Sequence, residues 1–189
     1  MKIYILQAIF ILFLMLFNSC NQGQKLFEEN SEDWDSFGEA SWTFSGDELA
    51  GTVSDDKTGF IMTRDTFSNF ILELEFRPDT VINSGVFVRC SKKEINTTDC
   101  YELNIWDRNP NQDYRTGAMV MKTRVLARVE TIDRWNTYKI VAEGKRIRAW
   151  VNDTLTTDIT DDSLSEGHIG LQALGNGTIK FRNIRIITL

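Results

Sequence analysis

Residues 83–90 (NSGVFVRC) and 101–107 (YELNIWD) carry polar and aromatic side chains at a spacing that could do chemistry. In extended backbone, successive side chains point to opposite faces. If the apolar residues of the second segment face a core, three of its side chains share the other face: Glu102, Asn104 and Trp106. Arg89 joins them if the valines of the first segment face the core. Such groups bind hydroxyls and support the apolar face of a pyranose, so we expect a carbohydrate groove here.

Two cysteines flank the loop between these segments, Cys90 at its start and Cys100 at its end. Both segments have the composition of strands, and a disulfide could hold them side by side. The alternative is two separate buried thiols. In an oxidising compartment the bond would persist, and a loop of this size would contribute about 2–3 kcal/mol of stability.

The N-terminus has the pattern of a secretory signal peptide over residues 1–19: a basic Lys2, an apolar run broken only by Gln7, and a small residue before Cys20. A membrane span would need about 20 apolar residues. Cys20 resembles the lipidated cysteine of a bacterial lipobox, although the two residues before Ser19 are larger or more polar than usual there. Plain secretion and a retained anchor helix are the alternatives.

Lipidation of Cys20 would leave the other two cysteines as one pair. We therefore expect a lipid-anchored protein of the cell envelope, with residues 20–25 as a tether and residues 26–189 as one domain. The membrane is then a partner only through the lipid. The sequence makes no prediction of the oligomeric state.

Alternating apolar and polar residues predict the strands that must position these side chains. The clearest is 70–77, whose polar face carries Glu73 and Glu75, which either line the groove or are simply solvated. Other runs predict further strands: 42–44, 51–63 with a turn at 55–57, 135–142, 146–152, 167–172, and 178–188 with a bulge near Asn183. Roughly ten to twelve short strands favour an all-β, two-sheet antiparallel jelly-roll sandwich.

Several kinds of chemistry are excluded by counts and charge. The chain has one histidine, His168, so a multi-histidine metal site is impossible, and we expect a structural role for this residue. There is no phosphate-binding loop or dinucleotide fingerprint. A net charge of −6 without a basic tract argues against a nucleic-acid partner. We predict no cofactor or metal, although the acidic pairs 55–56 and 161–162 are of a type that could bind calcium.

Several segments, taken in order, resemble the DUF1080 family, the 3-keto-disaccharide hydrolase domain. They are NSGVFVRC, CYELNIWD, TGAMV, WNTYKIVAEGKRIRAWVND, and GHIGLQ with FRNIRI, within residues 35–187. The resemblance implies a concanavalin A-like jelly roll. It also implies an exported protein of the Bacteroidetes type that acts on oligosaccharides or glycosides whose sugar is oxidised to a ketone at C3.

That substrate suits the residues at hand. Ordinary retaining glycosidases need two carboxylates about 5–5.5 Å apart, and Asp107 points away from Glu102 unless a bulge re-aims it. A C3 ketone acidifies the hydrogen at C2, so one base and one enolate stabiliser suffice. We predict Glu102 as the base and Arg89 as the partner of the ketone or enolate oxygen. Further roles are hydroxyl binding or proton donation by Asn104 and Asp107, and substrate binding by Trp106 and Gln172.

One departure from the family pattern keeps a second function open. Family members often carry a histidine in a Gln-x-His-Gly pattern, where this chain has Gln172-Ala173-Leu174-Gly175. The alternative is therefore a carbohydrate-binding lipoprotein that uses the same groove without turnover. If Arg89 and Glu102 only form an exposed ion pair, that pair adds little stability.

Overall fold

The computed structural model describes residues 23–26 and 32–189. The expected signal peptide and the lipidation site Cys20 lie outside the described residues. Beside one 3-10 helix, η1 (Gln112–Tyr114), these described residues form eleven strands: β1 (Gln24–Lys25), β2 (Trp34–Gly38), β3 (Ser41–Ser45), β4 (Glu48–Thr63), β5 (Phe70–Pro78), β6 (Asn83–Cys90), β7 (Tyr101–Ile105), β8 (Asn136–Glu143), β9 (Arg146–Val151), β10 (Thr154–Thr160) and β11 (His168–Thr188). Within residues 23–26 and 32–189, no helix is long and apolar enough to cross a membrane.

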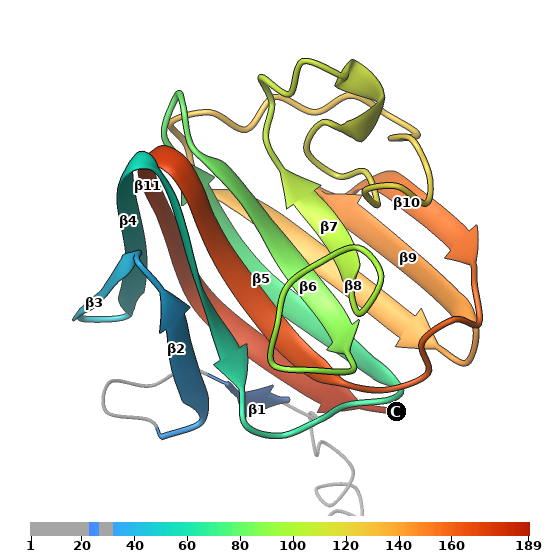
Figure 1. Ribbon diagram of the computed structural model, residues 1–189. Coiled ribbons are helices and arrows are strands. Elements are labelled where there is room, and N and C mark those ends of the chain that lie inside the picture. The colour runs from blue at the N-terminus through green and yellow to red at the C-terminus, as the bar shows by residue number, and fades with distance from the viewer. Residues whose placement is uncertain (1–22, 27–31) are drawn as a thin grey trace, which may run out of the picture.

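The strands form two antiparallel sheets that share the long strands β4 and β11 (Figure 1). The large sheet has the order β10-β9-β8-β5-β11-β4-β3, and the small sheet has the order β7-β6-β11-β4-β2. The first half of β11 pairs with β6, and its second half pairs with β5. The predicted all-β, two-sheet jelly roll is confirmed.

The backbones of β4 and β11 are both irregular at the point where these two strands pass from one sheet to the other. The predicted turn at 55–57 lies inside the continuous strand β4, where Asp55 and Asp56 have positive φ. Opposite them the register shifts at Asn176, which accepts a hydrogen bond from the Asp55 amide and donates one to the Asp56 carboxylate. The segments 167–172 and 178–188 are likewise one strand, and the bulge predicted near Asn183 is confirmed by a register shift there.

The core lies between the two sheets and is built from the alternation read in the sequence. In β5 the residues of one face are buried and those of the other are partly exposed. The small sheet contributes the apolar side chains of β6 and β7: Val86, Val88, Tyr101, Leu103 and Ile105. Burying one such side chain stabilises the fold by about 1.5–3 kcal/mol.

Glu73 and Glu75 lie on the outer face of the large sheet. Glu73 pairs with Lys139 at 3.3 Å, and Glu75 pairs with Arg182 at 2.7 Å. Glu102 alternates with core residues of the small sheet, so the core separates it from both glutamates. The possibility that they line one groove with Glu102 is therefore wrong, because the strands that carry them belong to opposite layers.

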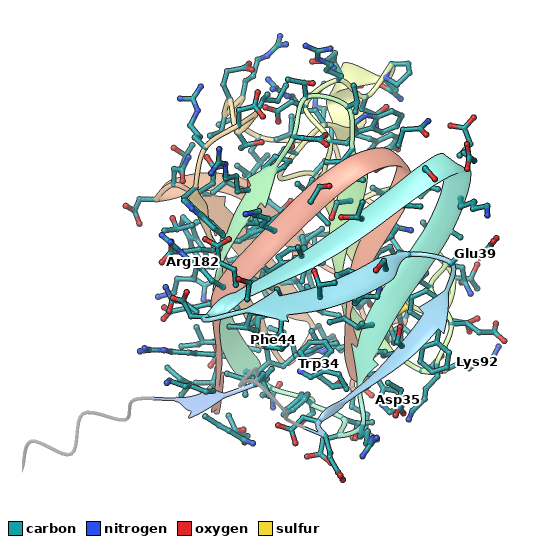
Figure 2. The ribbon with its side chains drawn as sticks, turned by 90° about the vertical axis from the view of Figure 1, so that its left-hand side faces the viewer. Trp34, Asp35, Glu39, Phe44, Lys92 and Arg182 are labelled. Carbon is teal, nitrogen blue, oxygen red and sulfur yellow. A yellow bond between two sulfur atoms is a disulfide. The ribbon has the colours of Figure 1, made fainter. Side chains whose placement is uncertain are left out.

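The predicted disulfide between Cys90 and Cys100 is confirmed, and it closes the loop 91–99 between β6 and β7. This loop folds back across the small sheet toward the edge strand β2, where Lys93 pairs with Asp35. Figure 2 shows Asp35 on this edge, near Lys92 of the same loop. Surface ion pairs contribute at most about 1 kcal/mol each, so the disulfide is the stronger restraint on the loop.

Arg89 does not face Glu102, and that prediction is wrong. His168 pairs with Cys90 but Gly170 pairs with Phe87, so a β-bulge interrupts the alternation at this point of β6. Arg89 itself has a φ of 53° and is 1 % exposed. Its guanidinium donates to three backbone carbonyl groups: Ser68 at 2.7 Å, Gly144 at 2.8 Å and Leu164 at 3.2 Å. Arg89 thus joins three loops and has a structural role.

We predict that Arg89→Met lowers the free energy of unfolding by at least about 3 kcal/mol, because three carbonyl groups lose their donor in a buried place. Urea unfolding measures the loss. Arg77→Met, at an exposed position of β5, is the matched control and should change stability little. Equal losses in the two variants would contradict the role given to Arg89.

Candidate functional site

Three strands of the small sheet place eight residues side by side on its outer face, and a ninth, Trp106, directly follows β7. Gly85 of β6 is the centre, with Gln172 of β11 opposite it on one side and Asn104 of β7 opposite it on the other. The register adds Leu174 and Asn83 on one side of this row, and Gly170, Phe87 and Glu102 on the other. Trp106 directly follows Ile105, the last residue of β7, and we count it with the first of these rows. We call these nine positions the Gly85 array. Adjacent strands lie roughly 4.8 Å apart, so its side chains can reach one ligand.

Two segments lie next to the array. Ile95 of the loop 91–99 packs against the cluster that contains Phe87 and the disulfide, and Figure 1 shows this loop in front of β6. On the far side of β7, the segment 118–120 lies alongside it like a short extra strand. The backbone N–H of Asn104 donates to the Ala118 carbonyl, and the backbone N–H of Val120 donates to the Glu102 carbonyl, both at 3.0 Å. The loop 91–99 and the segment 118–120 therefore flank the array.

Three amide side chains of the array have unsatisfied acceptors. The carbonyl oxygens Asn83 Oδ1, Asn104 Oδ1 and Gln172 Oε1 are buried without a hydrogen-bond partner among the described residues. The Asn104 amide is fixed in orientation because its Nδ2 donates to the Tyr114 carbonyl. A buried acceptor without a donor costs about 1–3 kcal/mol. Hydroxyl groups of a ligand are donors of the kind these oxygens require.

Glu102 is the one ionisable residue of the array. It is half-buried and has no hydrogen-bonding or ion-pair partner in the described part of the chain. Burial alone therefore raises the pKa of its carboxyl to about 7. A carboxyl group that exchanges its proton near neutral pH can act as a general base or acid.

Asp107 does not join the array, and the structure does not support its predicted catalytic role. Its Oδ2 accepts a hydrogen bond from the Thr131 amide at 2.6 Å, and its Oδ1 lies 3.4 Å from Arg115 Nη2. Arg115 also pairs with Glu130 at 3.1 Å. Asp107, Arg115 and Thr131 are buried, whereas Glu130 is exposed, and these contacts hold the ends of the loop 107–131 together.

Of the six predicted catalytic and substrate-binding residues, the strand register brings three together, Glu102, Asn104 and Gln172, and Trp106 directly follows β7. Sequence reasoning missed Asn83 and Gly85. The signal is present in the sequence, because both residues alternate with Val86 and Val88, the valines that can face the core.

The remaining candidates have structural partners. His168 Nδ1 lies 3.2 Å from the Asp65 carbonyl oxygen, in agreement with a structural role. Asp161, of one acidic pair considered for calcium, accepts hydrogen bonds from Tyr101 at 2.6 Å and Lys122 at 2.9 Å. Among the residues that the structure covers, no three potential ligands of the His, Cys, Asp or Glu type are grouped to hold a metal ion.

Comparison with known proteins points to carbohydrates. A family model described as a 3-keto-alpha-glucoside-1,2-lyase-like domain matches residues 22–187. The structure of a candidate glycosyl hydrolase from Parabacteroides distasonis is 26% identical, with a TM-score of 0.75, and the match covers 88% of this chain and 98% of that one. None of the curated proteins compared with the chain matches it.

More distant likenesses show the fold alone. A second candidate glycosyl hydrolase from Parabacteroides distasonis is 15% identical, with a TM-score of 0.69 over 83% of this chain and 88% of that one. The carbohydrate-binding module CBM66 from Bacillus subtilis is 22% identical, with a TM-score of 0.61 over 86% and 99% of the two chains.

The raised pKa of Glu102 predicts a pH-dependent stability. The folded state holds this proton up to pH about 7, whereas the unfolded state releases it near 4.5, so the stabilising contribution is complete below pH 4.5 and lost as pH rises through 7. Glu102→Gln has no carboxyl group to titrate. The free energy of unfolding of this variant, relative to that of wild type, should therefore rise by about 3 kcal/mol between pH 4.5 and pH 8.

Urea unfolding at both pH values tests this prediction. Glu73→Gln, which alters an exposed glutamate, is the control and should show no comparable gain. If the free energies of unfolding of wild type and Glu102→Gln differ by the same amount at pH 4.5 and at pH 8, the raised pKa of Glu102 is contradicted.

Proposed function

The chain belongs to the family of 3-keto-alpha-glucoside-1,2-lyase-like domains, and on that premise we propose that it cleaves glycosides whose sugar carries a ketone at C3. The observation that carries the proposal is the Glu102 carboxyl, with a pKa of about 7, beside three unsatisfied amide oxygens. One base within reach of hydroxyl-binding groups is what an elimination next to a ketone requires. Export and lipid anchoring through Cys20 are part of the same proposal.

In the proposed reaction Glu102 removes the hydrogen at C2, which the neighbouring ketone acidifies. The electron pair of the C2–H bond moves into an enolate. When the enolate collapses, a C1–C2 double bond forms, the ketone is restored, and the C1–O bond to the aglycone breaks. The protonated Glu102 can return its proton to the departing oxygen, and water then adds across the double bond at C1. The steps need no oxidant or reductant.

The enolate oxygen needs a donor other than Arg89, whose guanidinium is committed to backbone carbonyls. The Asn104 Nδ2 group already donates one of its two hydrogens to the Tyr114 carbonyl, which fixes its direction. The Nε2 group of Gln172 makes no hydrogen bond within the described residues, so we assign the enolate oxygen to Gln172. Side-chain amides serve as such donors in oxyanion holes.

The second candidate function is carbohydrate binding without turnover, and one position of the array favours it. In the Gln-x-His-Gly pattern of the resemblance, the histidine would occupy the position of Leu174, which lies in the array next to Asn83. The leucine leaves Glu102 without a second proton-transfer group there. Cleavage therefore depends on Glu102 alone in this chain.

The test is to incubate the full-length protein with a panel of 3-keto-glucosides and their parent glucosides and to follow aglycone release. We expect release from the keto forms only, and a loss of at least about 100-fold in kcat for Glu102→Gln. Glu73→Gln, on the outer face of the large sheet, should retain turnover. Undiminished turnover in Glu102→Gln would refute the assignment, and saturable binding without release would favour the binding function.

A further inference from the structure

The Glu102 side chain lies between two apolar neighbours on the outer face of the small sheet. On one side, the register of β6 and β7 places Phe87 directly opposite it. On the other side, Leu103 of β7 pairs with Met119. The backbone N–H of Val120 then donates to the Glu102 carbonyl at 3.0 Å, so Val120 stands opposite Glu102. Residues that are opposite each other in an antiparallel pair share a face, so Phe87 and Val120 flank the proposed base.

The position of Val120 is fixed by contacts on both sides of it in the chain. Met119, just before it, is fully buried in the core between the two sheets. Two residues after it, the Lys122 ammonium group binds the Asp161 carboxylate at 2.9 Å and the Ser163 hydroxyl at 3.2 Å. Val120 cannot move away from Glu102 without breaking core packing or these contacts, so it is a lasting neighbour of the carboxyl group.

The carboxyl group itself leans toward β6. Glu102 Oε1 lies 3.4 Å from the point that a Cβ of Gly85 would occupy, and Phe87 Cε2 lies 3.3 Å from the same point. The phenyl ring of Phe87 and the bare backbone of Gly85 provide no side-chain hydrogen-bond donor. The β6 side of the carboxyl group is therefore closed by groups that do not stabilise its charged form.

No cation on the surrounding segments compensates for this apolar environment. Those carried by β6, by the loop 91–99 and by the turn after Val120 have other partners among the described residues: Arg89 binds backbone carbonyls, Lys92 pairs with Asp99, Lys93 pairs with Asp35, and Lys122 pairs with Asp161. The other ionisable groups nearby are the exposed Glu94 and the hydroxyl of Tyr138, whose pKa is raised by burial. Burial is accordingly the cause of the raised pKa of Glu102.

We propose that Val120 is a positioning residue of this site, because it closes the side of the Glu102 carboxyl group that faces away from β6 and offers it no hydrogen-bond donor. The inference rests on the proposed function in taking Glu102 as the base. Water or a hydroxyl group at this position would stabilise the carboxylate and make it a weaker base. Beside Val120, the carboxyl group keeps the proton affinity that removal of the hydrogen at C2 requires.

The test is an NMR titration of the Glu102 carboxyl carbon with pH, in the full-length protein without substrate. Val120→Thr keeps the branched shape of valine and replaces one methyl group with a hydroxyl donor. We expect the pKa of about 7 to fall in this variant, with the proton dissociation constant about tenfold larger, as one hydrogen bond to a carboxylate predicts. Val120→Leu should keep the wild-type value, because the neighbour stays apolar.

Val141→Thr is the matched control, since Val141 lies on β8 of the large sheet, away from the small sheet that carries Glu102. It should leave the titration of Glu102 unchanged. In turnover of a 3-keto-glucoside, the acidic limb of the pH profile should move to lower pH in Val120→Thr by the same tenfold factor, because the base must lose its proton before it can act. The rate at pH 8 should fall, because the base is weaker.

Val120→Ala, which lets water reach the carboxyl group, should also lower the pKa of Glu102, and this comparison stands even if Val120→Thr does not fold. The same titration of Glu102 in wild type and in these two variants would overturn the proposal. A change of equal size in Val141→Thr would overturn it as well. Absence of aglycone release from 3-keto-glucosides, with the titration differences intact, would instead overturn only the proposed cleavage.

Discussion

The register of β11, β6 and β7 is the constraint on which the site depends. Gln172, Gly85 and Asn104 are far apart in the chain, and only antiparallel pairing of the three strands brings them into one row. A slip of one residue in β7 would turn Glu102 into the core and expose Leu103. The disulfide between Cys90 and Cys100 stands at the end of the β6–β7 pair and opposes such a slip.

Prediction from sequence worked where the alternation is regular and failed where it is interrupted. The five residues of β7 alternate without a break, so the outer-face positions of Glu102 and Asn104 follow from local pattern alone. Arg89 was misplaced because a bulge arises from pairing with β11, which the residues around Arg89 do not reveal. For the same reason the bend inside β4 read as a turn, since its partner Asn176 is distant in sequence.

The position of Arg89 also defines the electrostatics of the site. With that cation bound by backbone carbonyls, and with leucine at position 174, the array holds one ionisable group and several neutral dipoles. The pKa of Glu102 is then governed by burial rather than by a neighbouring charge. A base of this kind needs no counter-ion to be removed before it accepts a proton, and its activity is sensitive to how well the two loops exclude water.

Because β4 and β11 each run through both sheets, the two sheets cannot separate without breaking the pairing of these strands. Opening the small sheet would require β11 to leave β5 as well, so the strands that carry the site should exchange their amide hydrogens only when the whole domain unfolds. The fold thus behaves as a single cooperative unit, in which a ligand bound on the small sheet protects the large one to the same extent.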